Sequence, residues 1–220
     1  METISIIGAT GALGSGLATR WARSGYSVII GSRDAGRAET AARELNARVG
    51  GDRVSGLDNA DAATAGDIVV LAVKFEHQQD TLEQIKAGVQ GKILVDTTVP
   101  LVPPKVARVQ LPAEGSAGMI AQQFLGDGVE VVSAFQNITA EALSSGKAID
   151  CEVLVSGNAV DARNKVIELA AAAGMRAWHA GPLANSAAAE ALTSVLININ
   201  KRYGSAHAGI QINGVSRESS

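Results

Sequence analysis

The stretch Thr-Ile-Ser-Ile-Ile-Gly-Ala-Thr-Gly-Ala-Leu-Gly at residues 3–14 decides the fold. Its first half is rich in β-branched residues, which is typical of a short buried strand. Its second half contains Gly8, Gly11 and Gly14 and runs directly into a helical pattern. Glycines at such a turn let the backbone bend tightly, approach a ligand closely and pack a helix against a strand. The stretch therefore predicts a strand–turn–helix unit.

The turn between this strand and helix is a candidate nucleotide site. The free N–H groups at the start of a helix, together with the helix dipole, favour an anion such as a pyrophosphate. The sequence departs from the dinucleotide fingerprint G-x-G-x-x-G, because Ala9 replaces its first glycine and Gly8 stands one residue earlier. A glycine turn can be purely structural, but this one lies in a strand–turn–helix–strand unit, which favours a nucleotide.

The end of the second expected strand, residues 27–31, indicates which nucleotide binds. NAD sites normally carry an acidic residue there, which accepts hydrogen bonds from the ribose 2′-hydroxyl. This chain has Ser32 and Arg33 instead, and Arg37 follows one helical turn later. A hydroxyl and guanidinium groups can donate to a 2′-phosphate, so we expect NADP(H). Ser32 or Asp34 could instead cap the next helix and leave the arginines in solvent, but capping does not explain the missing acid.

The composition argues against several classes of protein. The chain has 220 residues, of which 46% are apolar and 19% charged, so it can bury a large core. The net charge of −3 argues against nucleic acid and anionic membranes as partners. No apolar run is long enough to span a bilayer, and the sequence enters a strand at once without a signal peptide. The only cysteine, Cys151, cannot form an internal disulfide, so we expect a buried side chain and a cytoplasmic protein.

Strands and helices alternate along the rest of the chain. This alternation predicts an α/β protein with a Rossmann-type doubly wound parallel sheet, whose ligands bind beyond the carboxyl ends of the strands. We expect further strands at residues 54–57, 67–73, 92–96, 129–134, 152–156 and 176–179. We expect helices at residues 11–24, 35–48, 58–65, 76–87, 116–125, 160–173 and 186–203. The loops at 97–104 and 135–140 follow strand ends and should lie at the functional edge.

The sequence lacks the familiar constellations of catalytic residues. The three histidines, His77, His179 and His207, are widely spaced and have no partner at metal-ligand spacing. Neither tyrosine, Tyr26 nor Tyr203, is followed by a lysine four residues later, so the proton-donating pair of short-chain dehydrogenases is missing. Carbonyl reduction needs such a donor, whereas hydride transfer between two bound redox rings depends chiefly on their orientation. We therefore expect no metal and a ring-shaped hydride acceptor.

Some residues near the expected site have two interpretations. His77 is either a possible catalytic residue at the functional edge or part of the first turn of the next helix. Lys74 either contacts a phosphate or is solvated. The aromatic residues Phe135 and Trp178 either pack in the core or stack on a ring.

Five motifs are spread over the chain. They are Ile-Ile-Gly-Ala-Thr-Gly-Ala-Leu-Gly (6–14), Gly-Ser-Arg (31–33), Lys-Phe-Glu-His (74–77), Val-Val-Ser-Ala (131–134) and Ala-Gly-Pro-Leu-Ala-Asn-Ser (180–186). Together they resemble the NADPH-dependent coenzyme F420 reductases. The similarity continues through residues 190–193 and 198–200 to residues 209–210, so it covers almost the whole chain. The first two motifs occur in many dinucleotide binders, whereas the motif at 180–186 is more specific.

The resemblance implies an NADP-binding Rossmann domain at residues 1–150 and a small C-terminal α/β domain at residues 151–220 that closes over the second substrate. It also implies hydride transfer between two small-molecule redox partners, NADP(H) and coenzyme F420. The implied cofactor site comprises Gly8, Ala9, Thr10, Gly11, Ala12, Leu13, Ser32, Arg33, Arg37, Val73, Lys74, Phe75, His77, Val99, Pro100, Ile138 and Ala140. The implied second-substrate site comprises Asn185, Thr193, Gly209 and Ile210.

Two departures from the family pattern keep other functions open. Lys74 and Phe75 stand where a proline and a tryptophan are usual, and Ala187 stands where an arginine is usual. The acceptor could therefore be another flavin-like ring or another compound. An NADP(H)-binding redox sensor without turnover is an alternative of a different class. Alanine-rich helix faces are consistent with a homodimer.

Overall fold

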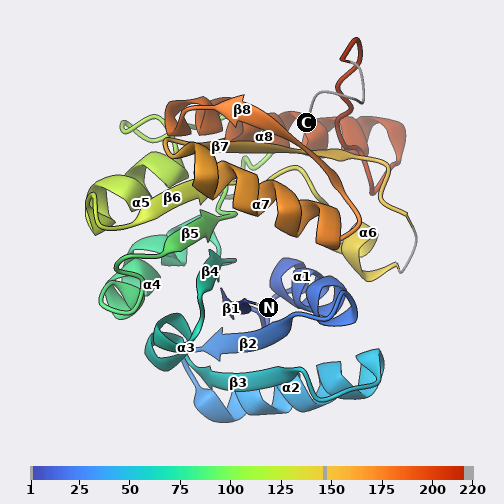
Figure 1. The fold of residues 1–220 in the computed structure, drawn as a ribbon. Helices are drawn as coiled ribbons and strands as arrows, with labels where there is room; N and C mark the ends of the chain where they lie inside the picture. The colour runs from blue at the N-terminus through green and yellow to red at the C-terminus, as the bar shows by residue number, and fades with distance from the viewer. Residues whose placement is uncertain (1, 146–147, 216–220) are drawn as a thin grey trace.

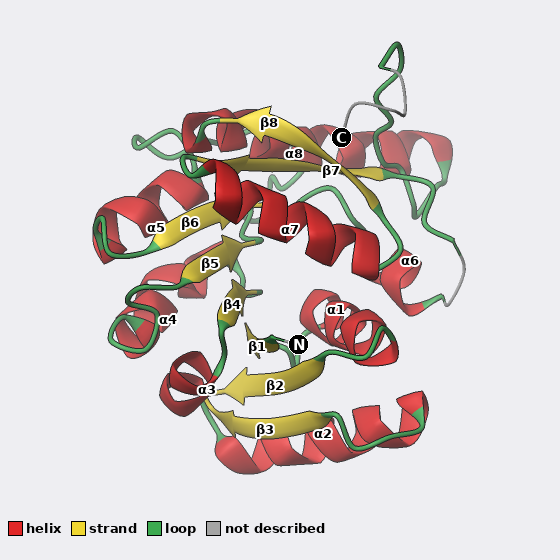
Figure 2. Cartoon of the chain, viewed as in Figure 1, coloured by secondary structure: helices red, strands yellow, loops and turns green. Residues whose placement is uncertain are grey.

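The computed structural model describes residues 2–145 and 148–215 (Figure 1, Figure 2). Its centre is one eight-stranded sheet in the order β3-β2-β1-β4-β5-β6-β7-β8. The strands are β1 (Thr3–Ile7), β2 (Ser27–Ser32), β3 (Val54–Asp58), β4 (Ile68–Leu71), β5 (Ile93–Asp96), β6 (Glu130–Ser133), β7 (Glu152–Gly157) and β8 (Arg176–Gly181). The strands from β3 to β6 are parallel, β7 is antiparallel to β6, and β8 is parallel to β7. The predicted doubly wound α/β fold is confirmed.

Helices cover both faces of the sheet (Figure 2). On one face lie α1 (Ala12–Arg23), α2 (Ala35–Val49), α6 (Ala140–Ser144) and α7 (Val160–Ala172). On the other face lie α3 (Asn59–Ala65), α4 (Gln78–Ile85) and α5 (Ala117–Leu125). The last helix, α8 (Ser186–Tyr203), contacts α5 and β7. Short 3-10 turns at Phe75–His77 and Leu183–Asn185 lead into α4 and α8.

Alternate side chains of β1 enter two separate cores. Ile4 and Ile6 pack with Leu17 of α1, whereas Ile7 belongs to the cluster that contains Leu82 of α4. Both faces of this strand are therefore buried, as in other parallel sheets that carry helices on both sides. This burial explains why the first strand is nearly continuous in apolar residues.

Two side chains of α1 join the N-terminal part of the chain to the C-terminal part. Trp21 is fully buried, and its Nε1 donates to the carbonyl oxygen of Leu169 in α7 at 2.8 Å. Arg20 donates to the carbonyl oxygens of Leu143 and Ala173, each at 3.0 Å, where α6 and α7 end and leave carbonyls without helical partners. The two parts share one hydrophobic cluster and one sheet. The expected division at residue 150 stays a prediction.

Two segments at the carboxyl edge of the sheet differ from the expected elements. The strand expected at 67–73 ends at Leu71, whose register partners, Ile7 of β1 and Asp96 of β5, are also the last residues of their strands. The segment 135–140 contains the start of α6, which the sequence analysis did not predict. Phe135 turns the chain there with a φ of 71°, and its ring packs edge-on against Trp21 with 6.0 Å between centroids. Phe135 is therefore a core residue.

Candidate active site

A cavity of about 350 Å³ lies at the carboxyl ends of β1, β2 and β4, where doubly wound sheets bind their ligands. Nine of the residues predicted to bind the nucleotide line it: Gly8, Thr10, Gly11, Ser32, Arg33, Arg37, Val73, Lys74 and His77. The sequence analysis missed six others: Asp34, Asn59, Ala72, Asp80, Thr81 and Gln84. Most of these six come from α3 and α4, which only the folded chain brings to the edge of β2.

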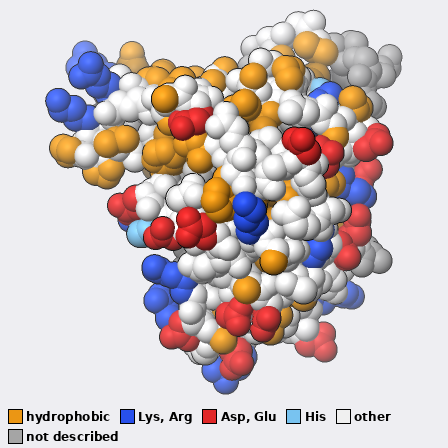
Figure 3. Space-filling model, turned by 90° about the vertical axis from the view of Figure 1, so that its left-hand side faces the viewer, with side chains coloured by type: hydrophobic (Ala, Val, Ile, Leu, Met, Phe, Trp, Pro, Cys, Tyr) orange, Lys and Arg blue, Asp and Glu red, His pale blue; other side chains and the backbone are white. Residues whose placement is uncertain are grey.

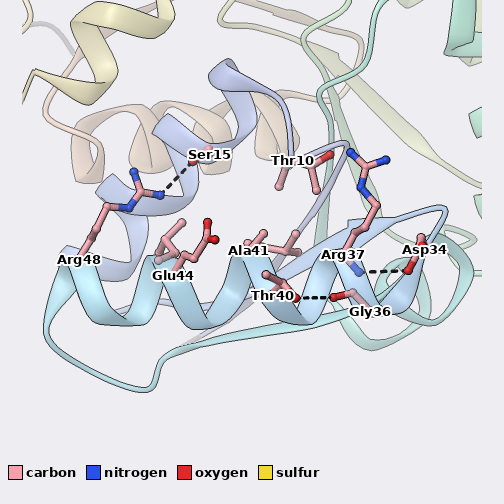
Figure 4. Close-up of a pocket in the computed structure, with 12 residues that line it drawn as sticks. Thr10, Ser15, Asp34, Gly36, Arg37, Thr40, Ala41, Glu44 and Arg48 are labelled. Carbon is pink, nitrogen blue, oxygen red and sulfur yellow. Dashed lines mark hydrogen bonds between the residues drawn. The ribbon is translucent and has the colours of Figure 1, made fainter.

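The remaining residues of the glycine turn lie beside this cavity. Ala9 is buried and lines an adjoining groove of about 630 Å³ between α1 and α2. Ala12 is exposed and Leu13 is half-buried at the start of α1. In the close-up of the groove, Arg48 of α2 donates to the hydroxyl of Ser15 in α1 at 3.3 Å (Figure 4). The groove therefore continues the 350 Å³ cavity along the two helices.

The absence of a side chain has a different structural effect at each of the three glycines in the turn. Gly8 has a φ of +87°, and a Cβ atom there would lie 2.6 Å from the carbonyl oxygen of Ala72. A Cβ atom on Gly14 would lie 2.7 Å from the Cα atom of Ala9, so this glycine lets α1 pack closely on the turn. Gly11 is exposed at the cavity, and its Cβ atom would meet only the carbonyl oxygen of Gly8, at 3.3 Å. Gly11 therefore leaves space for a ligand.

The end of β2 combines both interpretations of its polar residues. Asp34 caps α2, because its carboxylate accepts a hydrogen bond from the Arg37 N–H at 3.1 Å. The Ser32 hydroxyl accepts from the Asp34 N–H at 3.3 Å. Within residues 2–145 and 148–215, no ion pair joins Arg33 or Arg37 to an acid, and both side chains are exposed at the cavity. The two guanidinium groups are thus free to meet a phosphate.

Arg33→Ala should weaken NADPH binding by about ten- to a hundredfold, because it removes charge-assisted hydrogen bonds worth roughly 1.5–3 kcal/mol. NADH lacks the 2′-phosphate, so its weaker binding should hardly change. Fluorescence titration of both nucleotides measures the effect, and Arg43→Ala on the outer face of α2 is the matched control. Equal affinity of the unmodified protein for NADH and NADPH would contradict this assignment.

The residues expected to face the nicotinamide follow neighbouring strands at the same edge of the sheet. Val99 is half-buried and Pro100 is buried in the loop after β5. Ile138 is buried in the loop after β6. Ala140, the first residue of α6, is half-buried. These four residues do not line the 350 Å³ cavity; they extend the edge beside it. Phe75 is half-buried in the 3-10 turn after β4 and also lies outside the cavity lining.

Three of the four residues expected at the second substrate lie beyond the carboxyl end of β6. The Thr193 hydroxyl donates to the carbonyl oxygen of Gln136 in the β6–α6 loop at 3.1 Å. The carbonyl oxygen of Ile210 accepts from the N–H of Glu152 at the start of β7 at 2.9 Å, and Gly209 lies against Cys151.

Asn185 lies apart from this group. Its Nδ2 donates to the carbonyl oxygen of Ala180 at the end of β8, at 2.6 Å. A helical rise of about 1.5 Å per residue puts it about 12 Å along the axis from Thr193. The structure therefore brings Thr193 to the β6–α6 loop but holds the Asn185 side chain on β8.

No cluster of three or more possible metal ligands occurs among the described residues. No described helix is long and apolar enough to cross a membrane. Cys151 is a free, buried thiol, and burial raises its pKa above the usual value.

Similarity to known proteins is strong along nearly the whole chain. Residues 3–100 match the family described as NADP oxidoreductase, coenzyme F420-dependent. The F420-dependent NADP reductase of Methanothermobacter thermautotrophicus is 40% identical over 98% of this chain and 96% of that protein. The protein of the same name from Methanocaldococcus jannaschii is 39% identical over 95% of this chain and 97% of that protein. The chain belongs to this family.

A solved structure supports this family assignment. The crystal structure of a candidate F420-dependent NADP-reductase from Arthrobacter sp. FB24 superposes with a TM-score of 0.81. It is 26% identical and the alignment covers 97% of this chain and all of that chain. The resemblance predicted from the motifs is therefore confirmed for this member of the family of F420-dependent NADP oxidoreductases.

Two buried carboxylates of this family member were missed by the sequence analysis. Asp96 ends β5 and Glu190 lies in α8, and each side chain is 1% exposed. Glu190 accepts hydrogen bonds from the N–H groups of Ala117 at 2.7 Å and Gly118 at 3.1 Å, at the start of α5. An acid at the end of an otherwise apolar strand was the available signal for Asp96. The sequence of α8 alone could not show that the Glu190 side chain contacts the start of α5.

The stability of this protein should fall between pH 5 and pH 8 because of Glu190. Burial raises the pKa of its carboxyl group from 4.5 to about 8, so the folded chain holds one proton more than the unfolded chain in this interval. The free energy of unfolding should then fall by up to about 1.4 kcal/mol per pH unit as the pH rises. Urea unfolding at several pH values measures the slope.

Glu190→Gln is the matched variant for this pH dependence, because an amide does not titrate and has nearly the same shape. The variant should unfold with a flatter pH dependence than the unmodified protein. Burial also raises the pKa of Asp96, and the charge of Asp96 contributes to the raised pKa of Glu190, so the difference between the two curves reports Glu190 together with its coupling to Asp96. Identical slopes in the two proteins would contradict the prediction.

Proposed function

We propose that this chain transfers a hydride between NADP(H) and coenzyme F420 at the carboxyl edge of its sheet. The observation that carries the proposal is the juxtaposition of two features at this edge. A cavity with an open glycine turn and two free arginines lies beside the loops that follow β5 and β6. Membership of a family whose relatives are named for both molecules supports the choice of partners.

The glycine turn and the end of β2 would hold the nucleotide. The N–H groups of residues 10–13 start α1 and would meet the pyrophosphate, which the helix dipole also favours. Ser32, Arg33 and Arg37 would bind the 2′-phosphate. Val73, Phe75 and His77 would then border the nicotinamide, with Lys74 solvated at the rim, where it lies 3.7 Å from Glu76.

We propose a slot for the two rings, formed by Val73, Val99, Pro100, Ile138 and Ala140. These side chains are small, branched or rigid, so they would hold two flat rings face to face and exclude water. Hydride transfer to a conjugated ring leaves a delocalised charge, which backbone N–H groups and water can stabilise without a dedicated acid. His77 is half-exposed beside Glu76, which suits a residue at the rim more than a buried catalytic acid.

The C-terminal residues 151–220 would close the slot over the second ring. Thr193 contacts the β6–α6 loop, and Gly209 and Ile210 lie beside the start of β7, beyond the end of β6. These contacts support the proposal that part of α8 and the following segment lie near the acceptor. Asn185 would contribute only if its side chain left Ala180.

The proposed function is tested by steady-state oxidation of NADPH with coenzyme F420, FMN, FAD and a panel of aldehydes and ketones. Turnover is expected with F420, and His77→Ala should lower it by less than about tenfold, which is below the roughly 10²–10⁴-fold that a general acid–base residue typically contributes. Turnover of a simple ketone with no ring accepted would overturn the proposal. Tight NADPH binding without any turnover would favour the redox sensor instead.

We further propose that the chain is cytoplasmic and forms a homodimer. Of the nine exposed large hydrophobic residues in the described part of the chain, seven lie between Leu111 and Val215, and Val195, Ile199 and Tyr203 form a stripe along α8. In the space-filling view, hydrophobic side chains gather over the upper part of the molecule (Figure 3). Apolar surface of this kind commonly marks a protein contact. Sedimentation velocity measures the mass, and a monomer at micromolar concentration would contradict the dimer.

A further inference from the structure

A buried carboxylate lies where the start of α4 meets the loops that follow β5 and β6. Asp96 ends β5, and one of its carboxylate oxygens accepts from Gln78 Nε2 at 2.6 Å. The other oxygen accepts from the main-chain N–H of Thr98 at 2.8 Å. The main-chain oxygen of Asp96 accepts from Gln136 Nε2 at 3.0 Å. One residue thus receives hydrogen bonds from the start of α4 and from the loops after β5 and β6.

Two of these three donors are close in sequence to a residue of the proposed slot, and the third is next to a residue of the nucleotide cavity. Gln78 directly follows His77, which lines the nucleotide cavity after β4. Thr98 directly precedes Val99 in the loop after β5. Gln136 lies in the loop after β6, two residues before the slot residue of that loop. Asp96 itself lines none of the described cavities, so it acts on the slot only through these neighbours.

The network continues from Asp96 to the helices behind the slot. Gln78 Nε2 also donates to the carbonyl oxygen of Ala117 at 2.9 Å. The N–H of Ala117 in turn donates to the Glu190 carboxylate at 2.7 Å. On the other side, the Thr193 hydroxyl donates to the carbonyl oxygen of Gln136 at 3.1 Å. Glu190 and Thr193 of α8 are therefore connected through this network to Asp96 at the end of β5.

The buried carboxylate of Asp96 needs hydrogen-bond donors, and this need favours one arrangement of the segments around it. No ion pair to this carboxylate is found among residues 2–145 and 148–215, so hydrogen bonds alone compensate its burial. Burial raises the pKa of Asp96, and the hydrogen bonds from Thr98 and Gln78 oppose that shift. A buried acceptor that loses a donor costs free energy, so the network favours one arrangement of the loops.

We propose that Asp96 is the positioning residue of the hydride-transfer slot, because it holds Gln78, Thr98 and Gln136 at one point and so sets where the two rings stack. The inference rests on the proposed function for the identity of the rings. A misplacement of about 1 Å between reacting groups can lower a rate on the order of a hundredfold. Loosening this one residue should therefore affect the chemical step more than nucleotide binding.

The test is Asp96→Asn, which keeps the shape but places an N–H₂ group where an acceptor is needed. The kcat with F420 should fall about ten- to a hundredfold. The dissociation constant of NADPH should stay within about threefold, because the turn at Gly11 and the arginines that follow β2 lie in a different part of the site. With NADPH deuterated at the transferred position, the isotope effect on kcat should rise, because the hydride step becomes slower relative to release.

A matched control separates positioning from general loss of stability. Gln122 of α5 is also a tethering amide, which donates to the carbonyl oxygens of Gly126 and Val129 at the opposite edge of the sheet. Gln122→Met should lower the Tm but leave kcat and the isotope effect unchanged. Equal losses of kcat in Gln122→Met and Asp96→Asn would overturn the proposal.

Two further measurements decide the proposal if Asp96→Asn folds poorly or F420 is not the acceptor. Gln136→Met removes one donor and leaves the carboxylate in place, so its kcat should fall severalfold with the same rise in isotope effect. The fluorescence of bound NADPH reports the nicotinamide environment without any acceptor, and it should change in Asp96→Asn and Gln136→Met but not in Gln122→Met. Unchanged fluorescence in both slot variants would overturn the positioning role, whereas absence of F420 turnover in the unmodified protein would overturn only the proposed function.

Discussion

Gly11→Val is expected to abolish NADPH binding while the protein stays folded. The φ of −82° and ψ of 161° at Gly11 are extended values that valine adopts readily, and a Cβ atom would meet only the Gly8 carbonyl oxygen, at 3.3 Å. The two methyl groups would occupy the space that a pyrophosphate needs at the start of α1. The affinity should fall by more than about a hundredfold, since a charged ligand would lose several hydrogen bonds to N–H groups. Fluorescence titration measures the affinity.

Circular dichroism and the Tm show whether the Gly11→Val protein is folded. Gly51→Val is the matched control, because Gly51 lies in an exposed turn where a Cβ atom would contact nothing within 4 Å. That control should bind NADPH as the unmodified protein does. Full NADPH affinity in a folded Gly11→Val protein would show that the glycine turn is only structural.

Gly8→Ala is expected to destabilise the fold, although it is three residues from Gly11 and adds only one methyl group. The φ of +87° is unfavourable for alanine, and the Cβ atom would lie 2.6 Å from the backbone oxygen of Ala72. Backbone strain of about 1–2 kcal/mol and overpacking of about 1–3 kcal/mol together amount to roughly 2–5 kcal/mol. This sum is a large part of the stability of a typical domain. Urea unfolding of the apo protein measures it.

The comparison of Gly8→Ala with Gly11→Ala gives this prediction its control. Gly11→Ala should leave the free energy of unfolding nearly unchanged, because its backbone angles are ordinary and its Cβ atom faces the cavity. The two substitutions are chemically identical and lie in one turn, so only the local geometry distinguishes them. An unfolding free energy of Gly8→Ala within about 0.5 kcal/mol of the unmodified protein would contradict the account.

The nucleotide half could be predicted from the sequence because its signals are local. The β-branched run at Thr3–Ile7, the glycines after it and the residues that end β2 lie within one strand–turn–helix–strand unit. Asp34 and Arg33 illustrate the same point. Asp34 caps α2 by accepting a hydrogen bond from the N–H of Arg37, only three residues away, and the Arg33 guanidinium is exposed right beside this cap. Elements whose ends depend on a partner strand, such as β4 ending at Leu71, were less well predicted.

The sequence by itself determined the strand–helix alternation, the glycine turn and the absence of an acid at the end of β2. These follow from periodicity and backbone freedom, which act over a few residues. Only the tertiary structure decided that Asp96 receives donors from Gln78 of α4 and Gln136 of the β6–α6 loop and that Glu190 meets the start of α5. Such contacts join residues 18 to 73 positions apart. Their partners are set by how the sheet orders its strands and how α8 packs beside them, which no local pattern encodes.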